Sequence, residues 1–559
     1  MSSTAPNPSV AMARVFLDEF MRNDIDAVVL APGSRSGALA MAAAEQGRIR
    51  LHVALDERSA GFWAVGYAKL KMSPAVVLTT SGTAVANLFP AVIEADRSDT
   101  PLVILTADRP SEFRQSGANQ TIDQTKIFGE RVRFFADVPA ASDFRGEPGA
   151  WRSLVCQALA AARSGPVHLN LAFREPLVPA SDDGRAVADP YRGDLSGRPG
   201  GVAWTRTSPQ PNSRSALRVS GRTLVVAGPG ADLKLVYEAI GAGLVVVAEG
   251  HSSARVPGTI STAHHLLGST TVAKALTPDR TVVLGAAGLS RPLLNLLAGV
   301  ETTMVGKSWF DPGRRAVEVA EIDGWELAAA DEPWVASWHR AEATARQAID
   351  GVLDSFEETT EPRTARDVVA AVPDGGVLAV ASSMPVRDVD WFSAPRSGLA
   401  FVSNRGASGI DGFISLAAGA AAANEEHGDR PMVGLVGDLS FVHDTNGLLT
   451  KPTPDLVLVL VNNRGGGIFS FLPQADYPEH FERIFGTPSG VDFAGLTRAL
   501  GGSHWLIEHP EELTKSIGEA LSAGGIGVIE VRTDRVRNVA VHREVTEAVT
   551  AAVESLFEG

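Results

Sequence analysis

Short apolar runs rich in β-branched residues recur along the chain, separated by longer stretches with helical periodicity. The runs are 27–30, 75–78, 102–105 and 167–171, then 223–227, 244–247, 281–284 and 302–305, then 376–380, 432–436, 456–461 and 527–531. Nearly continuous apolar strands that alternate with helices are typical of parallel sheets covered on both faces. The pattern therefore predicts an α/β protein with three doubly wound parallel-sheet domains in series.

Two breaks in this pattern divide the chain. Residues 181–221 are rich in Pro, Gly, Ser, Asp and Arg and lack periodicity, which predicts a linker. A charged, turn-prone stretch at 355–363 marks the second boundary. We therefore expect a first domain at 1–180, a central domain at 222–355 and a third domain at 356–559. In doubly wound sheets ligands bind beyond the carboxyl ends of the strands, so the loops after strands are where chemistry is expected.

Composition narrows the class of protein. The formal net charge of −15 argues against a nucleic-acid-binding surface, which needs clustered Lys and Arg. The N-terminus lacks the basic and apolar segments of a signal peptide, and no apolar run is long enough to cross a bilayer. Cys156 is the single cysteine, so neither an intramolecular disulfide nor a thiolate zinc site can form. These features predict a cytoplasmic protein without nucleic-acid partners or membrane insertion.

Two polar residues follow neighbouring apolar runs of the third block. Asp438 follows the run 432–436, and Asn463 follows the run 456–461, 25 residues later. Adjacent parallel strands would bring both side chains to one edge of the sheet, and their oxygens with a nearby backbone carbonyl suit Mg²⁺. Taken alone, each residue is better explained as a helix cap or a turn. Together they are similar to the thiamine-diphosphate signature, Gly-Asp-Gly followed by Asn-Asn, except that Leu439 replaces the second Gly.

Glu57 stands where a strand passes into an apolar helix of small residues. Thiamine chemistry needs a buried carboxylate that hydrogen-bonds the aminopyrimidine ring, and burial would raise the pKa of such a group. The simpler explanation is an acidic residue favoured by the dipole at the start of a helix. The string Thr79-Thr-Ser81-Gly82-Thr83, with Asn87 close behind, is similar to the pyrimidine-binding domains of thiamine enzymes. We therefore expect Glu57 to be the activating acid.

Longer sequence strings point to one group within the thiamine-diphosphate enzymes. They begin at Ala31 (APGSRS), Asp56 (DERS), Thr106 (TADRP), Gly117 (GANQ), Ser403 (SNRGASGIDG) and Asn462 (NNRGGGIFSFLP). With these strings the chain resembles, over essentially its whole length, the menaquinone-pathway members of the thiamine-diphosphate enzymes, the 2-succinyl-5-enolpyruvyl-6-hydroxy-3-cyclohexene-1-carboxylate (SEPHCHC) synthases. The resemblance implies a transferase that decarboxylates 2-oxoglutarate and adds the resulting succinyl-semialdehyde carbanion to isochorismate. It also implies thiamine diphosphate and Mg²⁺ as cofactors, with Mn²⁺ as an alternative metal.

The resemblance also implies roles for individual residues. The metal would be held by Asp438 and Asn463 through their side chains and by Gly465 through its carbonyl. The cofactor would contact Glu57, Ser81, Gly82, Thr83, Ile410, Gly437, Asp438, Leu439, Ser440, Asn463 and Gly465, with Ile410 as the apolar prop that bends it. The substrate site would contain Ser34, Arg35, Arg109, Asn119, Gln120, Arg291, Ser383, Arg387 and Arg405, with an apolar wall of Ile468, Phe469 and Leu472. Arg291 departs from the pattern, because Ser290 precedes it where some relatives have a second basic residue.

The arginines agree with this substrate class on chemical grounds. Both implied substrates are dicarboxylates, and the guanidinium group pairs carboxylates at two points. A single arginine is more simply explained by a surface or interdomain ion pair, but four stand in strand-end loops. Another thiamine enzyme, either a 2-oxo acid decarboxylase or an acetohydroxyacid-synthase-like carboligase, is the nearest alternative. The glycine turn after the run 223–227 raises nucleotide binding as an alternative of another class, although the dinucleotide fingerprint is incomplete.

The expected quaternary structure also comes from the resemblance. Glu57 and the pair Asp438 and Asn463 lie in different blocks, yet all must contact one cofactor. In thiamine enzymes these two parts come from different subunits. We therefore expect a homodimer or homotetramer with active sites at the subunit interface.

Overall fold

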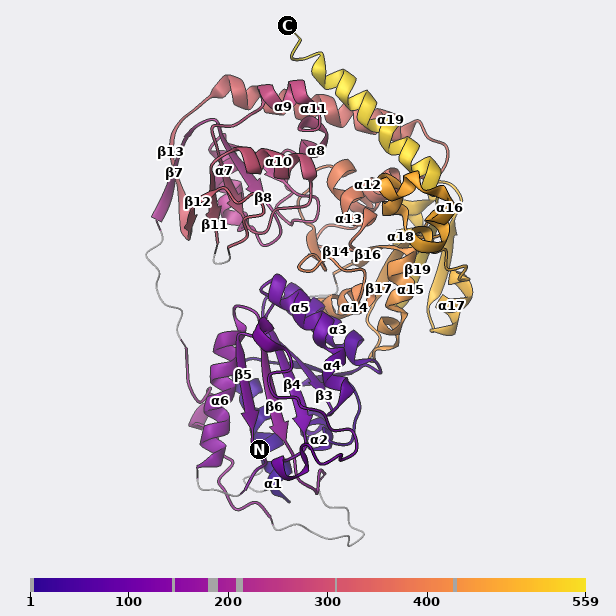
Figure 1. Cartoon of the computed structure of the whole chain (residues 1–559). Helices are drawn as coiled ribbons and strands as arrows, with labels where there is room; N and C mark the ends of the chain where they lie inside the picture. Colours follow the sequence, from indigo (N-terminus) through magenta and orange to yellow (C-terminus); the bar gives the residue numbers. More distant parts are fainter. Residues whose placement is uncertain are drawn as a thin grey trace. The chain divides into compact units, whose positions relative to one another are not determined.

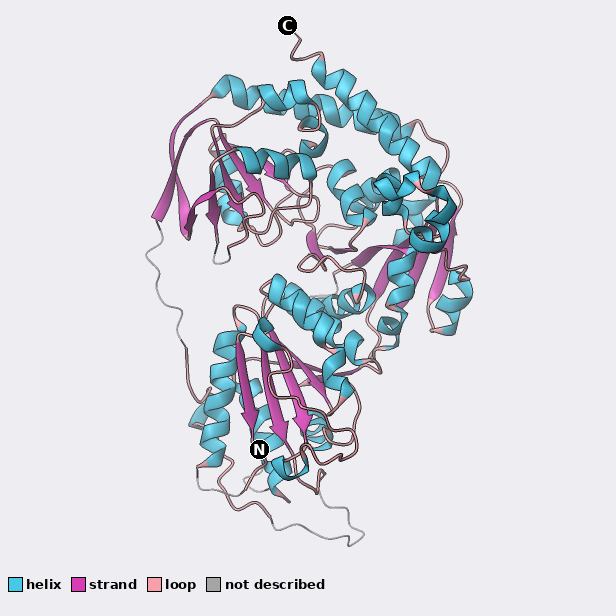
Figure 2. Cartoon of the chain, in the orientation of Figure 1, coloured by secondary structure: helices cyan, strands magenta, loops and turns pink. Residues whose placement is uncertain are grey.

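The computed structural model describes residues 5–142, 146–178, 190–207, 215–306, 309–425 and 430–558. Its strands form three larger sheets of six, five and six strands, all parallel, which confirms the predicted fold class (Figures 1 and 2). Contacts group the chain into two compact units, which are described separately below. Unit 1 comprises Met1–Pro209, Asn404–Asp429 and His443–Pro454, and unit 2 comprises Gln210–Ser403, Arg430–Val442 and Asp455–Gly559.

The sheet of unit 1 has the strand order β2-β1-β3-β4-β6-β5. Its strands are β1 (Ala27–Leu30), β2 (Arg50–Val53), β3 (Ala75–Thr79), β4 (Leu102–Asp108), β5 (Phe134–Val138) and β6 (Pro166–Ala172). Every residue of the four inner strands is buried, whereas the edge strands β2 and β5 are partly exposed. The apolar runs predicted the inner strands because burial on both faces requires apolar residues throughout.

Several helices of unit 1 begin at or directly after predicted site residues. They are α1 (Pro8–Arg22), α2 (Gly37–Glu45), α3 (Glu57–Lys71), α4 (Thr83–Asn87), α5 (Phe89–Arg97), α6 (Glu147–Ala162) and α14 (Phe413–Glu425). Helices α3 and α14 pack with their backbones in close approach. A Cβ added to Gly66 would strike the carbonyl oxygen of Leu416, and one added to Gly419 would strike that of Trp63. Only glycine fits these two positions, so the crossing of α3 and α14 depends on both.

The central sheet belongs to unit 2 and has the order β12-β11-β10-β8-β9. Its strands are β8 (Thr223–Ala227), β9 (Val245–Ala248), β10 (Arg280–Leu284), β11 (Thr302–Val305) and β12 (Ala316–Ala320), and its helices are α7 (Leu233–Gly241), α8 (Ala263–Leu266), α9 (Thr270–Ala275), α10 (Arg291–Gly299) and α11 (Glu332–Asp354). A two-stranded parallel ribbon pairs β7 (Ser215–Gly221) with β13 (Ile322–Ala330).

Strand β7 corrects the predicted linker. The end of the stretch 181–221 is not a linker but a strand, because β13 supplies a hydrogen-bonding partner about a hundred residues away that local composition does not reveal. Residues 181–189 and 208–214 of the same stretch lie outside the described residues. The division into three domains at the stated boundaries stays a prediction.

The third sheet, also in unit 2, has the order β15-β14-β16-β17-β19-β18. Its strands are β14 (Val377–Val380), β15 (Ala400–Ser403), β16 (Met432–Gly437), β17 (Leu456–Asn462), β18 (Ser503–Ile507) and β19 (Ile526–Arg532). Its helices are α12 (Glu361–Ala371), α13 (Met384–Phe392), α15 (Asp438–His443), α16 (Pro478–Phe481), α17 (Phe493–Ala499), α18 (Glu512–Ala523) and α19 (Arg535–Glu554). Short helical turns at Gly467–Phe471, Pro473–Asp476 and Glu482–Gly486 follow β17. None of the helices in the described residues is long and apolar enough to span a membrane.

Candidate active site

The strand-end loops, residues 437–440 and 463–467, lie at the carboxyl ends of β16 and β17. These two strands pair in parallel from Val433 beside Val457 to Gly437 beside Val461. Asp438 begins α15 directly after β16, and Asn463 directly follows β17. The prediction that both side chains share one edge of the sheet is therefore confirmed.

The carboxylate of Asp438 connects the two strand-end loops. It is 2% exposed, and its Oδ1 and Oδ2 accept the backbone N–H groups of Leu439 and Gly465, each at 2.8 Å. Burial raises the pKa of Asp438 to about 6, although these N–H donors and the charge of Arg535 favour the ionised form. A bound divalent cation would favour the carboxylate further, because an opposite charge lowers the pKa of an acid.

Asn463 presents its two amide atoms to different surroundings. Its Nδ2 donates to the Oε1 of Glu361 at 2.9 Å, while its buried Oδ1 has no hydrogen-bond partner among the described residues. The carbonyl of Gly465 accepts the N–H of Gly467 at 2.9 Å in a tight turn. A carboxylate, an unsatisfied amide oxygen and a carbonyl are oxygen ligands of the kind that Mg²⁺ prefers. No group of three or more His, Cys, Asp or Glu side chains that could hold a metal occurs within the described ranges.

The first strand-end loop leaves room for a ligand. A Cβ added to Gly437 would meet no atom within 4 Å, so the backbone there faces open space. Leu439, which replaces the glycine of the usual signature, is half-buried as the second residue of α15, and Ser440 is buried. The leucine is therefore accommodated by a helical turn and does not block the space beside Gly437.

A buried polar cluster lies behind Asn463. Its buried members are Glu361 of α12, Asp388 of α13 and His542 of α19, and the half-buried Thr533 of the loop after β19 joins them. Burial and the negative charge of Asp388 raise the pKa of Glu361 to about 7. Burial opposes a charged His542, but its 2.8 Å contact with the carboxylate of Asp388 outweighs burial and raises the pKa of the imidazole. This cluster therefore joins a predicted metal ligand to the helix that carries Arg387.

A cavity of about 780 Å³, lined by four arginines, two acidic residues and several apolar side chains, borders the second strand-end loop in unit 2. Its lining includes Asn463, Arg464, Phe481, Arg535 and Arg543. The guanidinium of Arg535 pairs with Glu482 at 2.8 Å, which ties α19 to the turn at Glu482–Gly486. The same turn contacts the loop directly, since the carbonyl of Gly486 accepts the N–H of Gly466 at 2.8 Å.

Most of the other predicted site residues of unit 2 lie beside another predicted site residue, but Arg291 does not. Ile468, Phe469 and Leu472 are half-buried in the turns after β17, as an apolar wall requires, with Phe469 against the ring of Phe485. Arg387 donates to the carbonyl of Ser383 at 2.6 Å, so these two residues lie together at the start of α13. Arg291, by contrast, is exposed at the start of α10, and within the described residues it contacts none of the others. Its role at the substrate site stays a prediction.

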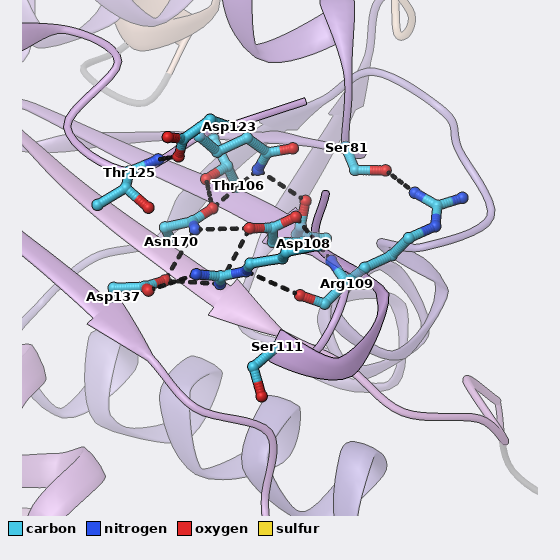
Figure 3. A network of polar contacts seen from close by, with 12 residues as sticks. Ser81, Thr106, Asp108, Arg109, Ser111, Asp123, Thr125, Asp137 and Asn170 are labelled. Carbon is cyan, nitrogen blue, oxygen red and sulfur yellow. Dashed lines mark hydrogen bonds and ion pairs between the residues drawn. The ribbon is translucent and has the colours of Figure 1, made fainter. Parts of the chain in front are cut away.

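In unit 1, Ser81 and Arg109 lie beyond the ends of β3 and β4, and their side chains point toward one another (Figure 3). The guanidinium of Arg109 donates to the hydroxyl of Ser81 at 2.7 Å and to the carbonyl of Gln120 at 2.6 Å. The next residue, Gly82, has a φ of +86° and donates its N–H to the side chain of Gln124 at 2.9 Å. The predicted cofactor loop 81–83 and the predicted substrate arginine are therefore joined by direct hydrogen bonds.

Arg35 adds a second cation near Arg109. Burial and the positive charge of Arg109 lower the pKa of Arg35, and its Nη1 donates to the carbonyl of Phe173 at 3.1 Å. Its Nε is buried and has no hydrogen-bond partner among the described residues. Ser34, the residue before it, is exposed, and so is Asn119. An anion between the two guanidinium groups would offset their repulsion, which is the arrangement that carboxylate binding needs.

The loop before α14 holds Arg405 and Ile410, both partly accessible. The buried carboxylate of Glu94 anchors this loop by accepting the N–H groups of Gly406 at 2.9 Å and Ala407 at 2.7 Å. Lys69 of α3 pairs with the same carboxylate at 2.6 Å. Glu94 therefore links the loop to α3, the helix that begins with Glu57.

Glu57 is the first residue of α3, directly after the N-cap Asp56. Its Oε2 accepts a hydrogen bond from the amide of Asn87 at 3.2 Å. The side chain is half-buried in this single chain and not fully buried as expected.

Several residues that organise the site were missed by sequence reasoning. In the network of Figure 3, Asn170 of β6 bonds Asp108, Asp137, Thr106 and Gln124 at 2.8–3.0 Å. Glu94 and Glu361 were missed as well. Asn170, Glu94 and Glu361 stand in no motif of known spacing, because each bonds partners far away along the chain. Asp108 could have been found, since it lies within the string that begins at Thr106.

Comparison with known proteins gives the family. Residues 11–127 match the model "Thiamine pyrophosphate enzyme, N-terminal TPP binding domain", and residues 381–531 match the corresponding C-terminal TPP binding domain. In structure, the chain is similar to benzoylformate decarboxylase from Polynucleobacter necessarius, with a TM-score of 0.62 and 19% identity over 94% of this chain and 98% of that one. At this identity the likeness extends to the fold alone.

Similarity in sequence is much higher to a group of enzymes with one name. A 2-succinyl-5-enolpyruvyl-6-hydroxy-3-cyclohexene-1-carboxylate synthase from Thermobifida fusca is 44% identical, over 98% of this chain and all of that protein. Synthases of the same name from Saccharopolyspora erythraea and Geobacillus kaustophilus are 41% and 38% identical, over 98% of this chain and at least 99% of theirs. The chain therefore belongs to the family of SEPHCHC synthases, thiamine-diphosphate-dependent enzymes of menaquinone biosynthesis.

Proposed function

We propose that this protein decarboxylates 2-oxoglutarate and adds the resulting four-carbon unit to isochorismate. The observation that carries the proposal is the oxygen set at the ends of β16 and β17, where Asp438 and the unsatisfied Oδ1 of Asn463 stand together. A hard cation at this position would bind the diphosphate of a cofactor, and the open space beside Gly437 of the first loop would admit the phosphates. Asp438, Asn463 and the carbonyl of Gly465 are the proposed ligands of Mg²⁺, with Mn²⁺ as a substitute.

The proposed cofactor explains why the chain needs few reactive groups of its own. When bound, thiamine diphosphate supplies a nucleophilic carbon and an electron sink for the loss of CO₂. Gly437, Leu439, Ser440 and the loop 81–83 are proposed to hold it, and Ile410 to set its bend. Glu57 is proposed to hold the proton that activates it, through a hydrogen bond to its pyrimidine ring.

The arginines are proposed to bind the carboxylates of both substrates. The positive charge of Arg109 lowers the pKa of Arg35, and Arg35 also pairs with the exposed carboxylate of Glu175 at 3.7 Å. A substrate carboxylate bound beside Arg35 and Arg109 would offset the repulsion between the two guanidinium groups. Arg387 with Ser383, together with Arg405 and Gln120, would bind further substrate oxygens. Ile468, Phe469 and Leu472 would pack against the apolar part of the ring and exclude water from it.

Homo-oligomerisation completes the proposal. A dimer or tetramer in which Glu57 of one subunit serves the strand-end loops of its partner would bury the half-exposed carboxylate. This arrangement follows the thiamine-diphosphate superfamily, to which the two matched domains belong.

The test follows isochorismate absorbance in the presence of Mg²⁺ and 2-oxoglutarate, with and without thiamine diphosphate. We expect loss of isochorismate only when both the cofactor and the oxo acid are present. An Asn463→Ala variant is the negative control, since it removes a proposed metal ligand. If cofactor-loaded protein consumes no isochorismate, the proposal is wrong, and other 2-oxo acids and acceptors become the candidates.

A further inference from the structure

Glu361 lies directly behind a proposed metal ligand. It is the first residue of α12, 3% exposed, and 102 residues before Asn463 in the chain. Its Oε1 accepts two hydrogen bonds, from Nδ2 of Asn463 at 2.9 Å and from the hydroxyl of Thr533 at 3.1 Å. Glu361 is thus held in place by the ends of two strands, β17 and β19, that pair with each other.

The hydrogen bond to Glu361 decides which way the amide of Asn463 faces. An amide has a donor end and an acceptor end, and only the acceptor end can bind a cation. Because a carboxylate oxygen attracts the NH₂ end, the Oδ1 must point away from Glu361, and it is the buried atom that lacks a partner. Rotation of the amide by half a turn would place two oxygens in contact behind it and two N–H groups toward the cation.

We propose that Glu361 is a positioning residue for the metal: it fixes the amide of Asn463 so that Oδ1 faces the cation. The inference rests on the metal site of the proposed function and adds a residue to it. Groups behind a metal ligand fix the orientation of that ligand, and their removal weakens metal binding by about 10- to 100-fold. Glu361 is not a ligand of the metal, the cofactor or the substrate, and it acts on the metal through Asn463.

Two conservative variants separate the effect of the hydrogen bond that orients Asn463 from the effect of the negative charge on Glu361. Glu361→Gln retains a carbonyl oxygen at the position of Oε1 but removes the charge. Glu361→Asp retains the charge but withdraws the carboxylate by one methylene, about 1.5 Å, so the 2.9 Å contact cannot persist. Glu249→Asp is the matched control, because Glu249 is a buried glutamate directly after β9 that accepts the backbone N–H groups of Gly288 and Leu289.

The measurement is Mn²⁺ affinity by electron paramagnetic resonance, at saturating thiamine diphosphate, with the thermal midpoint of each metal-free variant recorded beside it. We expect Glu361→Asp to bind Mn²⁺ about 10-fold more weakly, whereas Glu361→Gln and Glu249→Asp stay within about threefold of the parent chain. Parental affinity in Glu361→Asp, or an equal loss in Glu361→Gln or Glu249→Asp, would overturn the inference. If the parent chain and its Asn463→Ala variant bind Mn²⁺ alike, the proposed metal site itself is wrong.

Discussion

Asp438 and Asn463 offer oxygen to the same space by different means. The two oxygens of Asp438 each accept a backbone N–H, so the carboxylate holds the strand-end loops together while keeping lone pairs for a cation. In the amide of Asn463 only the oxygen can bind a cation, and the direction of this oxygen depends on the hydrogen bond to Glu361. At the scale of single residues, the proposed metal site therefore consists of the metal ligands and of the residue that fixes the orientation of one ligand.

Glu57 is the residue whose role is easiest to separate from its structural setting. We expect Glu57→Gln to lower turnover of isochorismate by about 100-fold or more, the usual size of a general acid–base contribution. Stabilisation by thiamine diphosphate and Mg²⁺ in a thermal melt should persist, since glutamine keeps the size of the side chain. The control is Glu147→Gln, a half-buried glutamate that also begins a helix, α6. Comparable losses of turnover in both variants would mean that the negative charge at the start of the helix matters, and not proton transfer by Glu57.

At the scale of elements, α3 and α14 connect several proposed site residues of unit 1. Helix α3 begins with Glu57, and α14 follows the loop that contains Arg405 and Ile410. The buried Asp444 ties their N-terminal ends, since it accepts hydrogen bonds from Ser59 of α3 and Ser415 of α14. Their glycine crossing then leaves little freedom for either helix to shift.

Gly66→Ala should destabilise this crossing. The added methyl would meet the carbonyl of Leu416, and overpacking of this kind costs about 1–3 kcal/mol or more. We expect a lower thermal midpoint of the metal-free protein. Gly518→Ala in α18 is the control, because a Cβ there meets no atom within 4 Å and alanine favours a helix by about 1 kcal/mol. An unchanged midpoint in Gly66→Ala would mean that the helices separate at little cost.

For the whole molecule, the pattern of burial explains which strands sequence reasoning found. The apolar runs predicted the inner strands of all three large sheets, and one edge strand, β9, that is fully buried. They did not predict β5, β12, β15 or β18, which are edge strands with partly exposed residues. An edge strand is covered incompletely, so its sequence lacks the continuous apolar run of a buried one.

Subunit complementation tests the proposed oligomer. Glu57→Gln and Asp438→Asn should each be nearly inactive alone. If each active site combines Glu57 of one subunit with Asp438 of its partner, a hybrid dimer has one intact site and about half of the wild-type activity. Co-expression with two affinity tags and purification through both isolates the hybrid. A hybrid as inactive as its parents would mean that both residues of a site come from the same subunit.

The sequence by itself determined the α/β class, the buried strands and the shared sheet edge of Asp438 and Asn463, because these follow from local apolar patterning and strand adjacency. It also carried the strings that identify the family. Only the tertiary structure decided that β7 is a strand, that Arg109 bonds Ser81 and that Glu361 orients Asn463. These depend on pairings between residues 28 to more than 100 positions apart. The identity of such a partner is set by how the chain packs and not by the residues on either side of it.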